Sequence, residues 1–66
     1  MGEYRLQIAG ADYEPRFDDE LTARNMALDL ATKYGQTMVY RASDNMLIAA
    51  YCRDGQYYES ATLNLG

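Results

Sequence analysis

The chain has 66 residues, with 10 Asp and Glu against 6 Lys and Arg, so its net charge is −4 and its pI about 4.4. This length suits one domain, residues 1–66, whose small core is marginal unless self-association adds to it. The lack of His removes the commonest general base and zinc ligand, and the single Cys allows no intrachain disulfide. We therefore expect a non-enzymatic binding protein without a metal or cofactor.

The N-terminus has no basic stretch followed by an apolar run, so it does not resemble a signal peptide. The longest apolar run, residues 46–52, is far shorter than the roughly 20 residues that span a bilayer. One free thiol fits a reducing compartment. A cytoplasmic protein with no membrane contact is therefore expected, and its acidity disfavours nucleic-acid binding driven by overall charge.

Residues 4–8 alternate apolar and polar side chains, which predicts a half-buried strand with Tyr4, Leu6 and Ile8 facing the core. Residues 10–16 are predicted to form a loop, because the only proline of the chain, Pro15, disfavours helix before it.

A helix is predicted to begin at Asp18, which is a good N-cap residue, and to end at Tyr34 before Gly35. Apolar residues recur at spacings of three and four along it, which indicates one buried face. The residues of that predicted face are Ala23, Met26, Ala27, Leu30 and Tyr34.

Three further strands are predicted at residues 36–42, 46–53 and 56–63. Asp54 and Gly55 favour a two-residue hairpin loop, which pairs Tyr51 with Tyr58. Residues 43–45 are preferred as a three-residue loop, because a two-residue loop would turn Arg41 inward. The core side of these strands then holds Met38, Tyr40, Ala42, Met46, Ile48, Ala50, Cys52, Tyr57, Ala61 and Leu63, with Glu59 as the single misfit.

The predicted fold is α+β, in the order β-α-β-β-β. One helix packs on one face of a four-stranded, mostly antiparallel sheet. A right-handed crossover through the helix would place the second strand parallel to the first.

The opposite face of that sheet is the predicted binding face. Its full set is Arg5, Gln7, Thr37, Val39, Arg41, Leu47, Ala49, Tyr51, Arg53, Tyr58, Ser60 and Thr62. The residues predicted to carry binding are Arg5, Val39, Arg41, Leu47, Tyr51, Arg53 and Tyr58. Such a face is either simply solvated, or an interface with a foreign protein or a second copy, since Tyr and Arg are enriched at interfaces. A third interpretation has Tyr51 and Tyr58 stack on bases while arginines contact phosphates.

Half of the carboxylates gather in one short stretch, comprising Asp12, Glu14, Asp18, Asp19 and Glu20. Helix capping explains the last three, whereas Asp12 and Glu14 have no assigned role. The stretch lacks the Gly and the closing Glu of a calcium loop. An acidic surface that mimics nucleic acid is a weaker hypothesis for a binding role here.

Together these features predict a small, non-enzymatic, protein-binding regulatory module that forms a homodimer or docks on a larger partner. An inhibitor or accessory protein of the kind that phages and mobile elements encode would have this size and acidity. The alternative is a single-stranded nucleic-acid-binding protein that uses the same sheet face.

Overall fold

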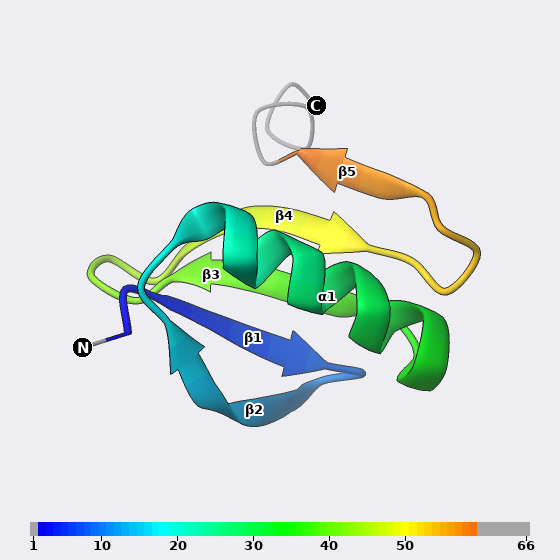
Figure 1. Cartoon of the computed structure of the whole chain (residues 1–66), viewed down its shortest axis with the longest axis horizontal. Helices are drawn as coiled ribbons and strands as arrows, with labels where there is room; N and C mark the ends of the chain where they lie inside the picture. The colour runs from blue at the N-terminus through cyan, green and yellow to red at the C-terminus, as the bar shows by residue number, and fades with distance from the viewer. Residues whose placement is uncertain (1, 60–66) are drawn as a thin grey trace.

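One helix packs against one face of a five-stranded antiparallel sheet, which confirms the predicted α+β class (Figure 1). The computed structural model describes residues 2–59. Neighbouring strands lie in the order β2-β1-β3-β4-β5. The elements are β1 (Tyr4–Ile8), β2 (Ala11–Phe17), α1 (Glu20–Tyr34), β3 (Thr37–Arg41), β4 (Met46–Tyr51) and β5 (Tyr57–Glu59). The predicted inward residues Ala61 and Leu63 lie outside the described residues.

The predicted loop at residues 10–16 is wrong, because this stretch forms the edge strand β2. Ala9 and Gly10, at φ values of 51° and 88°, make a two-residue turn that pairs Ile8 with Ala11. Pro15 is tolerated there because an edge strand needs no hydrogen-bond donor on its outer side. The fifth strand of the sheet comes from this hairpin.

β3 runs antiparallel to β1, and the predicted parallel crossover is therefore wrong. The β1–β2 hairpin returns the chain to the Tyr4 end of β1, where Phe17 pairs with Tyr4 and α1 follows. The helix then carries the chain to the other end of β1, where Thr37 pairs with Ile8. The chain thus reverses direction three times, at the β1–β2 hairpin, before α1 and after α1, and this odd number leaves β3 antiparallel to β1.

The N-cap of α1 lies one residue later than predicted, and the helix ends where predicted. Asp19 rather than Asp18 is the N-cap, and its Oδ2 accepts a hydrogen bond from the backbone N–H of Thr22 at 2.9 Å. Gly35 follows Tyr34 with a φ of 120°, a value that favours glycine.

The buried face of α1 consists of Ala23, Ala27, Leu30 and Ala31, with Met26 half-buried beside them. The prediction is wrong for Tyr34, which is 64% exposed, because the last helical turn projects beyond the end of β1 (Figure 1). Three alanines with no exposed surface let the helix backbone lie close to the sheet.

The inward face of β3, and that of β4 from Ala49 to Tyr51, are the reverse of those predicted. Thr37, Val39, Ala49 and Tyr51 are buried on the α1 side of the sheet. Pairing between these two strands is nevertheless as predicted at Met38 and Ala50, where β3 and β4 lie opposite each other.

Pairing of β3 with β1, rather than with β4, decides which face of β3 meets the helix. Val39 lies opposite Leu6, and cross-strand neighbours share a face, so Val39 follows Leu6 into the core. Ile48 still packs against the core as predicted, because a register shift beside Val39 adds one residue to β4 there.

Candidate functional site

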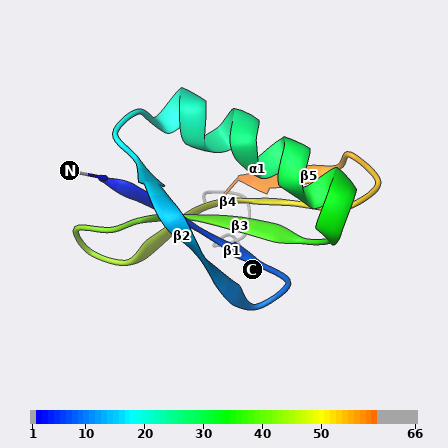
Figure 2. The same ribbon diagram turned by 60° about the horizontal axis from the view of Figure 1, so that its bottom comes forward.

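Among the described residues, α1 covers one side of the sheet and no element covers the other (Figure 2). Cross-strand neighbours on the uncovered side form two rows. The first row, from β2 to β5, is Asp12, Gln7, Met38, Ala50 and Tyr58, and the second, from β1 to β4, is Arg5, Tyr40 and Leu47. We call these eight residues the open face.

The part of the open face on β3, β4 and β5 is apolar. Met38, Tyr40 and Leu47 are half-buried, and Tyr58 is 43% exposed. Ala50 is only 4% exposed although no helix covers it, because Met38 and Tyr58 flank it on the neighbouring strands. The smallest side chain of the face therefore lies between larger ones.

The part on β1 and β2 is polar and its side chains hold one another in place. The guanidinium of Arg5 lies 4.4 Å from the centre of the Tyr40 ring, and its Nε donates to Asn45 Oδ1 at 3.1 Å. Asp12 Oδ1 accepts from Gln7 Nε2 at 3.1 Å and lies 3.4 Å from Arg5 Nη1. These contacts fix the polar side chains before any partner binds.

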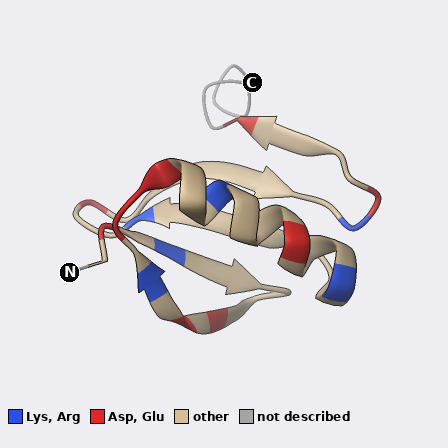
Figure 3. Ribbon diagram, viewed as in Figure 1, with Lys and Arg blue, Asp and Glu red and all other residues tan. Residues whose placement is uncertain are grey.

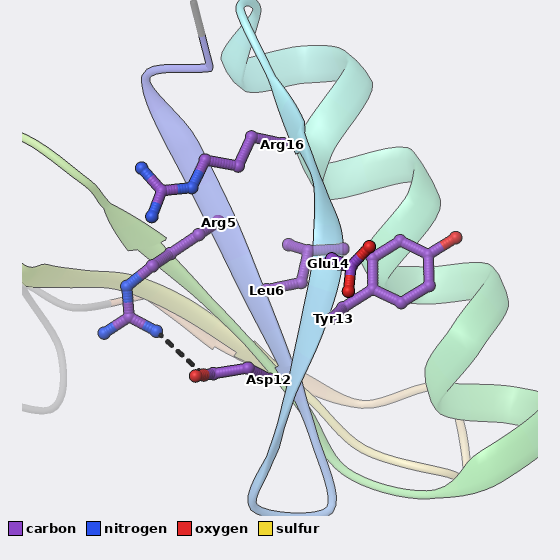
Figure 4. Close-up of a pocket in the computed structure, with 6 residues that line it drawn as sticks. All are labelled: Arg5, Leu6, Asp12, Tyr13, Glu14 and Arg16. Carbon is purple, nitrogen blue, oxygen red and sulfur yellow. Dashed lines mark hydrogen bonds and ion pairs between the residues drawn. The ribbon is translucent and has the colours of Figure 1, made fainter.

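A surface pocket of about 200 Å³ lies at the outer end of the polar part, where the β1–β2 register shifts (Figure 4). The side chains of Arg5, Asp12 and Arg16 extend to one side of β2, and Tyr13 extends to the other (Figure 4). This volume is below that of ordinary small-molecule sites.

The structure places only part of the predicted binding residues on the open face. Arg5, Leu47 and Tyr58 lie there. The placement of Val39 and Tyr51 was wrong, because they are 0% and 7% exposed in the core against α1.

The two remaining predicted arginines lie in or beside loops. Arg41, at the end of β3, donates through Nη2 to Asp44 Oδ2 at 2.8 Å, and this contact raises the pKa of Arg41 and lowers that of Asp44. Arg53 lies in the loop between β4 and β5.

The predicted pairing of Tyr51 with Tyr58 is also wrong. Tyr51 lies opposite Tyr57, with ring centres 5.5 Å apart, and Tyr58 lies opposite Ala50. The loop contains three residues, 53–55, because the Cys52 N–H donates to the Gln56 carbonyl at 2.7 Å. One additional loop residue shifts the register and brings the two tyrosines to opposite faces.

The acidic stretch is not one loop. Asp12 and Glu14 lie on the edge strand β2, whereas Asp18, Asp19 and Glu20 lie at the start of α1 (Figure 3). Asp19 caps the helix, and Glu20 Oε2 accepts from Arg24 Nε at 2.8 Å. Asp19 and Glu20 thus have structural roles within the helix.

Acidic and basic residues lie close to one another on the surface and are not separated onto two sides of the molecule. Within residues 2–59, four basic residues each lie within 4 Å of a carboxylate, namely Arg5, Arg24, Lys33 and Arg41. A nucleic-acid phosphate would compete with these ion pairs.

The sequence interpretation missed Met38, Tyr40 and Ala50 as open-face residues and assigned them to the core. Hydrophobicity carries no signal that separates them from Val39 and Ala49, because both sides of β3 and β4 are apolar. Only the pairing of β3 with β1 separates the two sets.

Glu59, the misfit of the predicted core, does face α1 and has a partner there. Its carboxylate accepts two hydrogen bonds from the Arg24 guanidinium, at 2.5 and 2.9 Å. Hydrogen bonding to Arg24 holds the pKa of the Glu59 carboxyl below its ordinary value of 4.5, and the same contact raises the pKa of Arg24. This ion pair joins β5 to the helix.

We predict that the Glu59→Gln variant loses less stability in acid than the unchanged protein. The pKa of Glu59 is lower in the folded state than in the unfolded state. The stability that its charge contributes is therefore fully present above about pH 4.5 and is lost as the pH falls through the folded-state pKa. The effect is modest because the Glu59 side chain is 42% exposed and solvent screens it. Urea unfolding from neutral to acidic pH measures it, with the exposed Glu14→Gln as control; equal acid losses in all three proteins would contradict it.

Comparison of the chain with protein families, with curated proteins and with solved structures gave no match. Residues 2–59 hold no group of three or more His, Cys, Asp or Glu side chains placed to bind a metal ion. No helix within the described ranges is long and apolar enough to cross a membrane.

Proposed function

We propose that this chain is a small non-enzymatic protein-binding module and that the open face is its binding surface. The observation that carries the proposal is the sheet with one uncovered side, where Met38, Tyr40, Leu47 and Tyr58 surround Ala50. Aromatic residues, Met and Arg are enriched in protein interfaces, and an apolar centre with a polar border is the usual arrangement.

The fixed polar side chains support the same proposal. Arg5 is held by Tyr40, Asn45 and Asp12, and its side chain is only 20% exposed. A surface that is ordered before binding loses less side-chain entropy when the partner arrives. The proposal includes a regulatory or inhibitory role, of the kind found in phages and mobile elements, which the small size and acidity of the chain support. It also includes a cytoplasmic location, which the single thiol supports.

Single-stranded nucleic acid has less support as the occupant. That interpretation needed Tyr51 and Tyr58 side by side, and Tyr51 is buried on the other side of the sheet. It also needed Arg41 to contact phosphate, whereas Asp44 binds this guanidinium. Oligonucleotide binding is therefore included as a separate arm of the test below.

The test is affinity capture from the host lysate with three immobilised proteins, followed by quantitative mass spectrometry. The Leu47→Glu substitution places a charge in the apolar part of the open face, and we expect it to remove the specific partner. Leu21→Glu is the matched control, because Leu21 is 65% exposed on α1. Partners that Leu47→Glu retains would contradict the proposal. So would a labelled single-stranded oligonucleotide that binds at low salt and is released by the Leu47→Glu substitution.

A further inference from the structure

We infer that the occupant of the open face is a second copy of this chain, packed face to face through a two-fold axis. The inference rests on the proposed function, because it names the partner of the same surface. Its basis is that the exchange of the two rows brings apolar residues onto apolar residues and opposite charges together. A surface that complements itself is what an isologous dimer requires.

The axis runs across the strands, between the two rows. On β1, β3 and β4 the first row carries Gln7, Met38 and Ala50, and the second row carries Arg5, Tyr40 and Leu47. Rotation by 180° about this axis keeps each strand over its own counterpart and exchanges the rows. Each residue of the first row then faces the second-row residue of the same strand in the other copy.

The exchanged residues on β4 are both apolar. Leu47 of one copy comes over Ala50 of the other, and the symmetry repeats this contact on the far side of the axis. Ala50 is 4% exposed because Met38 and Tyr58 flank it, so Leu47 packs on the apolar surface that these two larger side chains form around Ala50. Tyr40 meets Met38 at the centre of the interface in the same way.

The charges match on β2. Asp12 belongs to the first row and is 77% exposed, and Arg16 extends beside Arg5 of the second row (Figure 4). No carboxylate within residues 2–59 lies within ion-pair distance of Arg16. Row exchange brings Asp12 of each copy over Arg16 of the other, so the dimer gains two equivalent ion pairs.

Gly2 helps to position Arg16. A Cβ atom at Gly2 would lie 2.0 Å from the Cβ of Arg16, so only glycine allows the N-terminal segment to pack there. The base of the Arg16 side chain is thereby held at the border of the open face.

The resulting assembly is a four-layer helix–sheet–sheet–helix sandwich. Two antiparallel sheets pack face to face at about 10 Å with their strands nearly aligned, which is a common arrangement in proteins. Both faces of each sheet are then covered, and the marginal core of a 66-residue chain gains a second apolar layer.

A charge exchange between two chains tests this geometry. Sedimentation equilibrium of the unchanged protein should show a dimer. Asp12→Arg and Arg16→Glu should each raise the dimer dissociation constant about tenfold or more, because like charges then meet twice in each homodimer. An equimolar mixture of the two variants should restore the dimer, since the two chains now carry opposite charges at both contacts.

Matched controls come from the outer side of α1, where Asp29 and Lys33 form an exposed ion pair. Asp29→Arg and Lys33→Glu make the same charge changes and should leave the dimer unchanged. A far-UV circular dichroism spectrum like that of the unchanged protein confirms folding of each variant.

A monomer at all concentrations would overturn the second copy as occupant. If Leu47→Glu still removed a captured partner in that case, the proposed function would stand without this inference. A dimer that resists both charge substitutions, or that fails to return in the mixture, would overturn the two-fold arrangement. Recovery of the mixed dimer together with unchanged controls would establish it.

Discussion

Replacing Val39 with aspartate is expected to leave the chain unfolded at neutral pH and room temperature. Val39 has no exposed surface and lies in the core cluster between β1 and α1. The variant loses about 1.5–3 kcal/mol of apolar burial. It also buries a carboxylate without a partner, which costs several kcal/mol. A chain of this length has a total stability of about 3–10 kcal/mol, so the sum of the losses is comparable to the whole.

The adjacent residue is the control for this experiment. Met38 lies on the same strand with its side chain on the open face, so Met38→Asp should cost about 1 kcal/mol and leave the monomer folded. Circular dichroism during thermal unfolding separates the two outcomes. If Val39→Asp folds and Met38→Asp does not, the assignment of faces on β3 is reversed.

Replacing Leu6 with alanine is expected to lower the free energy of unfolding by about 2–5 kcal/mol. Leu6 is among the largest fully buried side chains, at the centre of β1. The core cluster to which it belongs includes Ala23 and Ala27, whose side chains are too short to fill a cavity. Relaxation is therefore limited, and the loss should fall in the upper part of this range.

Urea unfolding measures the effect of Leu6→Ala, with Leu21→Ala as its control. Leu21 is 65% exposed on α1, so its truncation should change stability by no more than about 0.5 kcal/mol. A loss at Leu6 no greater than that at Leu21 would mean that β1 is not the centre of the core.

The β3–β4 pair shows how a correct local prediction can be combined with the wrong face. Hairpin chemistry predicts which residues of two neighbouring strands lie opposite each other, and Met38 does pair with Ala50. The same reasoning cannot choose the inward side when both sides are apolar. That choice was made by Leu6 pairing with Val39, a contact between residues far apart in the sequence.

The wrong choice of inward side also affected the prediction of the candidate site. Arg5, Leu47 and Tyr58 were predicted on the binding face and lie on it, whereas Val39 and Tyr51 belong to the core. For Leu47 and Tyr58 the agreement depends on two local irregularities, a register shift beside Val39 and one additional residue in the β4–β5 loop. Such irregularities leave little trace in a pattern of alternating residues.

By itself the sequence determined the elements whose signals are local. The inward side of β1, the end of α1 at Gly35 and the one-helix α+β class all follow from periodicity and capping within a few residues. Tertiary structure alone decided the β2 edge strand, the antiparallel order and the composition of the open face. Those features depend on which strands pair with each other. Strand pairing is stabilised by contacts between residues that lie far apart in the sequence, so local patterns do not reveal it.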